Sequence, residues 1–148
     1  MKLRILLVED DYMQRQSIQD ALEANLEGVA VETKASEWEF LSDFEAIASN
    51  PPDIAVLDVM LRWANLSRDA PDPPAGQWEP QLAGLRCAQR LHDDARTGGV
   101  RVILYTVFDL GNMHDVILPE GTIWLTKELS VQELVDTIKR LLPTSCEE

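Results

Sequence analysis

The stretch ILLVEDD, Ile5 to Asp11, decides the fold, because a short apolar run passes directly into three consecutive acids. The apolar run begins at Leu3 and is rich in branched residues, as in a strand that helices cover on both faces of a parallel sheet. Four later stretches have the length and composition of strands, and they lie at residues 29–33, 54–57, 100–105 and 122–125. The sequence therefore predicts five strands.

Helical patterns separate these strands. Residues 11–25 carry apolar or small residues at helical spacing and end before Gly28. Ser36 and Ser130 each start a Ser-x-x-Glu capping box, and each precedes an amphipathic stretch. Strand followed by helix, five times, predicts a doubly wound α/β fold: a five-stranded parallel sheet with helices on both faces and right-handed crossovers.

One segment, residues 62–83, is too long for an ordinary strand-to-helix connection. It contains four prolines, two tryptophans (Trp63 and Trp78) and little periodicity. Loops of this length are uncommon inside compact domains and are usually functional or disordered. We predict an inserted loop within one domain that spans residues 1–148, with the tryptophans anchoring the loop on its own domain.

Composition excludes several classes of protein. The chain of 148 residues carries a net charge of −13, which opposes direct binding to nucleic acid. No apolar run approaches the roughly 20 residues that span a bilayer, and the short start does not resemble a secretory signal. The two cysteines have neither metal-ligand nor disulfide spacing. We therefore expect a cytoplasmic protein that binds neither nucleic acid nor membrane.

Polar side chains follow four of the predicted strands where each one ends. Glu9 and Asp10 follow the first strand, Asp58 the third, Thr106 ends the fourth and Lys127 follows the fifth. The carboxyl ends of parallel strands meet in one crevice, so these side chains are expected to converge. Crowded carboxylates need a cation, and hard oxygen ligands suit Mg²⁺ or Mn²⁺. The set predicts phosphoryl transfer, with a carboxylate as nucleophile and a hydroxyl and an ammonium contacting the phosphoryl oxygens.

The same segments resemble the receiver domains of bacterial two-component response regulators. The resemblance rests on ILLVEDD at 5–11, AVLDVML at 55–61, ILYT at 103–106 and WLTK at 124–127, in that order. It covers nearly the whole chain outside the inserted loop. It implies a flavodoxin-like sheet with the strand order 2-1-3-4-5, and a phosphorylation-dependent signalling switch rather than an enzyme.

The resemblance also implies a role for each acidic residue. Asp58 would accept a phosphoryl group from a histidine kinase or a phosphotransfer protein. Asp10 and Asp58 would bind the metal directly, Glu9 mostly through water, and Met60 through its backbone carbonyl. Mg²⁺ or Mn²⁺ is thus the expected cofactor.

Three further residues take switch and contact roles by the same resemblance. Thr106 would swing toward the phosphoryl group, and Lys127 would pair with it. Trp124 occupies the aromatic switch position, where its rotamer would report the state of Thr106 to partners. Because the chain ends just after its last helix, we expect a stand-alone receiver that acts by binding a downstream protein or a second copy of itself.

The sequence departs from the family at several positions near the site. Glu128 follows Lys127 where the family has a proline with a cis bond, and a cis non-proline bond costs about 2.5 to 4 kcal/mol. Val107 follows Thr106 where the family usually has a small residue, and Val107 and then Phe108 are expected to narrow the entrance to the phosphoryl site. Met60 and Phe108 lie where the family tunes water attack, so we predict slow hydrolysis of phosphorylated Asp58.

Two departures concern the connections. The family reaches a glycine, matched here by Gly84, within a few residues of the third strand, whereas this chain first passes through the loop. Residues 109–120 carry an early glycine and a late proline, which predict a short or irregular fourth helix.

Two other functions are compatible with parts of the pattern. A receiver-like docking module would keep the fold without phosphorylation, although the intact acidic set argues against it. A metal-dependent phosphohydrolase with an aspartate nucleophile typically has a second aspartate two residues later, and Met60 stands at that position.

Overall fold

The computed structural model describes residues 2–64, 70–73, 82–112, 116–127 and 130–142. Trp78 and Glu128, both singled out above, lie outside the described residues. In chain order the elements are β1 (Arg4–Val8), α1 (Tyr12–Asn25), β2 (Ala30–Lys34), α2 (Glu37–Ser42), α3 (Phe44–Ser49), β3 (Ile54–Leu57), α4 (Ala83–Asp93), β4 (Arg101–Thr106), a 3-10 helix (Leu110–Asn112), β5 (Ile123–Thr126) and α5 (Gln132–Leu141).

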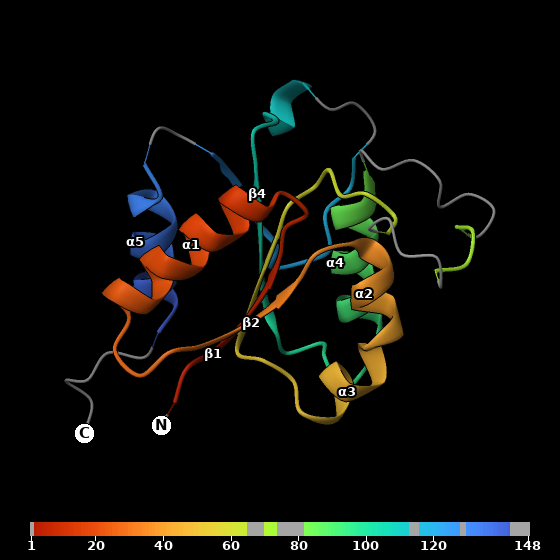
Figure 1. Cartoon of the computed structure of the whole chain (residues 1–148), viewed down its shortest axis with the longest axis horizontal. Helices are drawn as coiled ribbons and strands as arrows, with labels where there is room; N and C mark the ends of the chain where they lie inside the picture. The colour runs from red at the N-terminus through yellow and green to blue at the C-terminus, as the bar shows by residue number, and fades with distance from the viewer. Residues whose placement is uncertain (1, 65–69, 74–81, 113–115, 128–129, 143–148) are drawn as a thin grey trace.

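The five strands form one parallel sheet in the order β2-β1-β3-β4-β5, which confirms the predicted topology (Figure 1). The third strand has the predicted bounds, and the other four differ from the prediction by one residue at one or both ends. Val8 pairs with Leu57, and Leu57 pairs with Leu104. Residues that follow β1, β3 and β4 therefore emerge at one edge of the sheet.

Helices cover both faces of the sheet, α1 and α5 on one side and α2, α3 and α4 on the other (Figure 1). Side chains alternate along a strand, so β1 serves both layers. Ile5 and Leu7 pack in the cluster with α1 and α5, whereas Leu6 and Val8 pack in the cluster with α2, α3 and α4. Each face thus buries its own apolar core, and burial of apolar area is the main stabilising contribution.

The helix predicted after Ser36 is divided in two, which corrects the expectation of one continuous helix. Ser36 Oγ accepts a hydrogen bond from the Glu39 N–H at 3.1 Å, so the predicted cap is present. The chain leaves helical geometry at Asp43, where φ is −102° and ψ is 7°, and α3 starts immediately afterwards. Phe40 and Phe44 lie on either side of the break and are both buried, with ring centroids 5.8 Å apart.

The connection from β4 to β5 has no α-helix among its described residues, so the pattern of strand and helix repeated five times is wrong here. Its described part contains only the 3-10 helix. Asp109 accepts a hydrogen bond from the Gly111 N–H at 2.9 Å, an Asx-type turn that tightens the chain where a helix would begin. The sequence warning of an irregular helix over 109–120 is confirmed for the described part.

The capping box expected at the start of α5 is altered. Ser130 Oγ accepts a hydrogen bond from the Gln132 N–H at 3.1 Å, two residues further along the chain, whereas the capping box predicts a bond from the residue three positions further along. Within the described ranges, no helix has the length and apolar character that a membrane crossing requires.

Candidate metal centre

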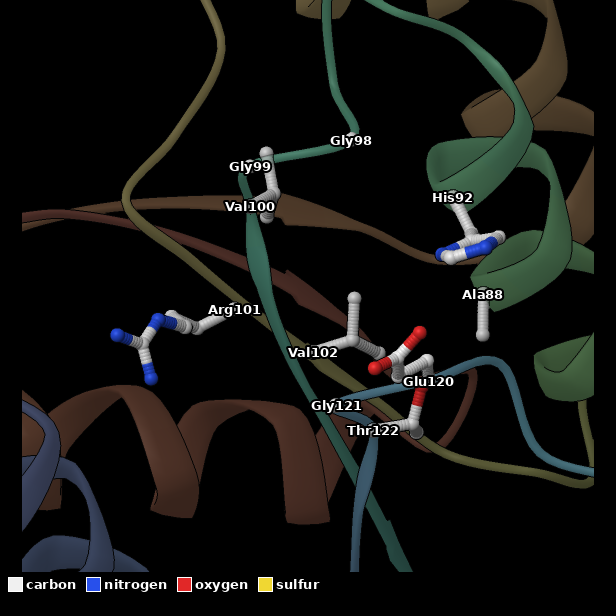
Figure 2. A pocket seen from close by; sticks show the side chains of 10 residues that line it. All are labelled: Ala88, His92, Gly98, Gly99, Val100, Arg101, Val102, Glu120, Gly121 and Thr122. Carbon is white, nitrogen blue, oxygen red and sulfur yellow. The ribbon is translucent and has the colours of Figure 1, made fainter.

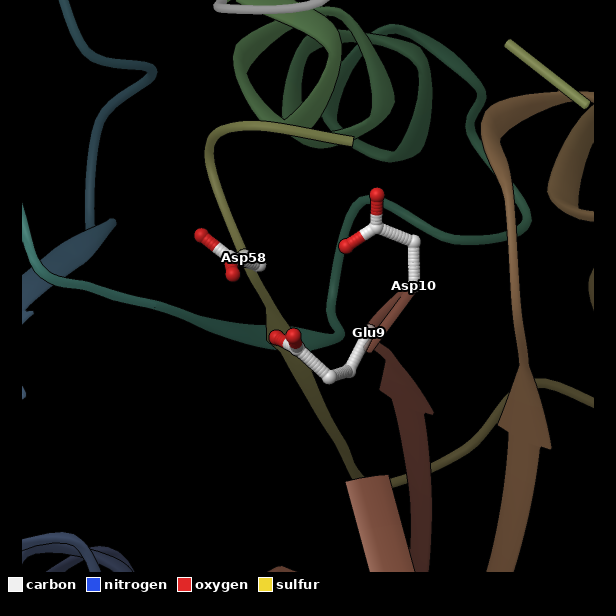
Figure 3. A group of neighbouring side chains, drawn as sticks. All are labelled: Glu9, Asp10 and Asp58. Carbon is white, nitrogen blue, oxygen red and sulfur yellow. The ribbon is translucent and has the colours of Figure 1, made fainter. Parts of the chain in front are cut away.

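Three carboxylates meet at the carboxyl edge of the sheet, as the sequence predicts. Glu9 and Asp10 directly follow β1, and Asp58 directly follows the neighbouring strand β3. One oxygen from each lies within 4.8 Å of the other two. Figure 3 shows the three side chains next to the ends of their strands. Three hard, anionic oxygens at this spacing fit a divalent cation such as Mg²⁺, which would offset their mutual repulsion.

Lys127 contacts two of these carboxylates. Its Nζ lies 3.1 Å from Glu9 Oε2 and 3.0 Å from Asp58 Oδ2, and it also donates to Gln14 Oε1 at 2.6 Å. An ammonium has three N–H donors, so these three acceptors saturate it. Burial lowers the pKa of Lys127, but the charges of Asp58 and Glu9 outweigh burial and leave the pKa raised. Lys127 is therefore a fixed positive charge between the first and third strands.

Glu9 is the most deeply buried member of the cluster, with a relative exposure of 1%. Burial, assisted by the neighbouring Asp58 carboxylate and opposed by Lys127, raises the pKa of Glu9 from its ordinary 4.5 to about 8. Its Oε1 accepts from the Asp11 N–H at 3.3 Å, and its backbone carbonyl accepts from Arg15 at 2.8 Å. The raised pKa makes Glu9 easier to protonate than an ordinary glutamate, and a bound cation would compete with the proton.

Asp10 has a cation partner that the sequence did not predict. Its Oδ2 accepts from the backbone N–H of Arg62 at 3.1 Å and from the Arg62 Nε at 3.3 Å. Arg62 opens the inserted segment, and nothing in its local pattern distinguishes it from a solvated surface residue. The insert therefore contacts the acidic cluster directly.

The backbone around Asp58 is fixed by the helix that follows the insert. A Cβ atom on Gly84 would lie 2.0 Å from the Asp58 carbonyl oxygen and 2.6 Å from the Val59 Cα, so glycine alone fits. The Gly84 N–H donates to the Val59 carbonyl at 2.8 Å. The Met60 N–H in turn donates to Asp58 Oδ1 at 3.3 Å. These contacts set the position of the Asp58 carboxylate.

Comparison with solved structures gives a consistent match along the chain. The chemotaxis response regulator CheY4 of Vibrio cholerae is 19% identical with a TM-score of 0.69, over 96% of this chain and 100% of that one. The response regulator TrrA of Thermotoga maritima, solved with Mg(2+)-BeF, is 22% identical with a TM-score of 0.67, over 96% and 100%. The receiver domain of the sensor histidine kinase PA1611 of Pseudomonas aeruginosa, with a magnesium ion in its active site cleft, is 19% identical with a TM-score of 0.67, over 95% and 97%.

This chain has the response regulator receiver fold. Comparisons with protein-family models and with curated proteins gave no match. The likeness is thus one of structure at low sequence identity, and the site residues have to be argued from their own geometry.

Within this receiver fold, one backbone segment connects the two predicted switch residues. Thr106 is fully buried, and its Oγ1 accepts from the Phe108 N–H at 3.4 Å. Trp124 is half-buried, and its Nε1–H donates to the Phe108 carbonyl at 3.0 Å. The Phe108 backbone therefore hydrogen-bonds to both Thr106 and Trp124, and the coupling between these two residues stays a prediction.

The surroundings of Lys127 are more open than the sequence suggested. Val107, expected to narrow the entrance, is 64% exposed and lines a groove of about 550 Å³ beside Lys127. Gln14 and Tyr105 line the same groove. The effect of Val107 on phosphotransfer stays a prediction.

A second pocket of the receiver fold, of about 280 Å³, lies near the amino ends of β4 and β5 (Figure 2). Its charged side chains do not converge: Arg101 points to the other side of β4 from His92 and Glu120. The acidic cluster, with its converging charges, is the better candidate for chemistry.

Proposed function

We propose that this chain is a phosphorylation-dependent signalling switch in which Asp58 accepts a phosphoryl group. The observation that carries the proposal is the contact of one buried ammonium, Lys127, with both Glu9 and Asp58 beside Asp10. Such a set holds the nucleophile, the metal ligands and a phosphoryl-binding cation in one place.

The chemistry follows from these groups. An Asp58 carboxylate oxygen attacks the phosphorus of a phosphohistidine on a histidine kinase or a phosphotransfer protein. The P–O bond forms as the P–N bond breaks, and its electron pair returns to the imidazole nitrogen. The product is an acyl phosphate on Asp58.

A bound Mg²⁺ or Mn²⁺ would neutralise charge on the phosphoryl oxygens. Glu9, Asp10, Asp58 and the Met60 backbone carbonyl are its proposed ligands. Glu9 would hold the ion in its carboxylate form, so any proton on Glu9 would be released when the ion binds.

The remaining residues act on the phosphoryl group and on the output. Lys127 exchanges its contact with the Asp58 oxygen for a phosphoryl oxygen, and the Thr106 hydroxyl donates to another. Movement of Thr106 is passed through Phe108 to Trp124, and the altered surface changes affinity for a downstream protein or for a second copy of the chain.

Intact-mass analysis after incubation with Mg²⁺ and acetyl phosphate tests the proposal. Wild type should gain one phosphoryl group, whereas Asp58→Asn and an EDTA-treated sample should not. Asp94→Asn is a matched control, since Asp94 pairs with Arg96 outside the cluster and its variant should be labelled like wild type. If wild type gains no adduct, a receiver-like docking module that works without phosphorylation becomes the better function.

A further inference from the structure

The position of Arg62 brings a positive charge onto a proposed metal ligand. The Asp10 side chain is 19% exposed, and its Oδ2 receives both the backbone N–H and the guanidinium Nε of Arg62. One oxygen from Asp10 also lies within 4.8 Å of oxygens from Glu9 and Asp58. A metal ion shared by the three acids would therefore bind a carboxylate that already has a cation beside it.

Besides its hydrogen bond to Asp10, the backbone of Arg62 is also held by helix α2. The first N–H groups of a helix have no partners within the helix. In α2 the Glu37 N–H donates to the Arg62 carbonyl at 3.1 Å, and the Trp38 N–H donates to the Trp63 carbonyl at 2.7 Å. The start of the insert thus caps the helix.

Aromatic contacts reinforce this attachment. The Trp63 ring centroid lies 5.7 Å from that of Trp38, and the Trp63 indole N–H donates to the Pro71 carbonyl at 2.7 Å. The expectation that Trp63 anchors the loop on its own domain is therefore confirmed. Because the backbone is held on α2, the start of the Arg62 side chain is positioned beside Asp10.

We propose that Arg62 sets the metal affinity of the site by competing with the divalent cation for Asp10. The proposal rests on the metal-binding part of the proposed function. The guanidinium and the cation repel each other and need the same carboxylate, so the guanidinium leaves Asp10 when the metal binds. The Arg62 side chain is 54% exposed and can turn into water, while its backbone stays on α2.

The expected change in Mg²⁺ affinity follows from the solvent exposure of the Arg62–Asp10 ion pair. Exposed ion pairs contribute about 0.2 to 1 kcal/mol, which corresponds to a change in affinity of roughly one and a half to five times. Arg62→Gln removes the competing charge and keeps a polar side chain of similar length. Its Mg²⁺ dissociation constant should therefore be lower than that of wild type by up to about fivefold.

Arg15→Gln is the matched control. It removes the same charge near the same cluster, but Arg15 donates to the Glu9 backbone carbonyl and not to a carboxylate. Its Mg²⁺ affinity should change less than that of Arg62→Gln. Arg62→Met serves as a second variant, and the circular dichroism of each protein is compared with wild type before titration.

Isothermal titration calorimetry with Mg²⁺ at one fixed pH measures all four proteins. Tighter binding by both Arg62 variants, with a smaller change in Arg15→Gln, supports the proposal. Equal or weaker binding by the Arg62 variants, or an equal gain in Arg15→Gln, overturns it while leaving the phosphoacceptor function intact. Absence of Mg²⁺ binding in every protein, wild type included, overturns both.

Discussion

The acidic cluster is flanked by two cations whose surroundings differ sharply. Lys127 comes from the end of β5, leaves 10% of its side chain exposed and bridges Glu9 and Asp58. Arg62 comes from the insert, leaves 54% exposed and contacts Asp10 alone among the three acids in the described contacts. Lys127 is positioned by a strand of the sheet, whereas Arg62 is positioned by the contacts of the insert with α2. Lys127 should therefore govern stability and phosphoryl binding, and Arg62 should adjust the metal affinity of the site.

The largest loss of stability is expected at a buried ion pair of α2, the helix on which the start of the insert is held. Glu37, whose N–H donates to the Arg62 carbonyl, is 1% exposed and forms a two-point ion pair with Arg86 of α4 at 2.7 and 2.8 Å. Arg86→Met leaves a buried charge unpaired and should lower the free energy of unfolding by about 3 to 5 kcal/mol. Urea denaturation measures it. Arg96→Met, at an exposed ion pair, should cost far less, and equal losses would contradict the comparison.

The same substitution at the two cations compares them directly. Lys127→Met removes charged hydrogen bonds in a largely buried setting and should cost about 1.5 to 3 kcal/mol in metal-free protein. Arg62→Met breaks an exposed pair and should cost about 0.2 to 1 kcal/mol. Chemical denaturation in EDTA provides both values. A larger loss of unfolding free energy in Arg62→Met than in Lys127→Met would contradict the view that Lys127 is the fixed cation and Arg62 the adjustable one.

Gly84→Ala tests the close approach of α4 to Asp58. A methyl group 2.0 Å from the Asp58 carbonyl oxygen forces the backbone apart, and overpacking of this kind costs about 1 to 3 kcal/mol. The shift should also slow labelling of Asp58. Gly99→Ala is the control, since a Cβ there meets no atom within 4 Å and the variant should unfold like wild type.

The stability of the metal-free protein should depend on pH through Glu9, the buried carboxyl that Lys127 contacts. Its pKa is about 8 in the folded protein against an ordinary value of 4.5, so the folded state keeps a proton that the unfolded state loses in this window. Metal-free protein should therefore lose stability as pH rises from about 4.5 to about 8, by at most about 1.4 kcal/mol per pH unit. Denaturation in EDTA at several pH values measures the slope. Glu9→Gln should flatten it, and a slope of the opposite sign would count against the buried protonated Glu9.

The sequence predicted the site residues that directly follow regular strands. Glu9, Asp10, Asp58 and Lys127 each follow a short apolar run, and parallel strands bring their ends together whatever the loops do. The family resemblance matched Gly84 to the glycine that follows the third strand, and its close approach to the Asp58 carbonyl supplies the reason for a glycine.

The sequence could not predict contacts that depend on tertiary packing. Phe40, Phe44 and Ile47 continue at helical spacing across Asp43, and no glycine or proline marks the break. Arg62 lies in a segment without periodicity, and its contact with Asp10 accompanies the capping of α2 by the start of the insert, which no local pattern indicates. The irregular connection after β4, whose described residues hold no α-helix, was easier to predict, because Gly111 and Pro119 weaken the helical pattern locally.

The most direct test of the central claim is to locate the phosphoryl group. Borohydride reduces an aspartyl phosphate to homoserine, so peptide mass mapping of labelled and reduced protein identifies the acceptor. We predict one homoserine, at position 58, formed only when Mg²⁺ is present during labelling. Homoserine at another aspartate, or labelling that proceeds equally in EDTA, would contradict the assignment of Asp58 as a metal-dependent phosphoacceptor.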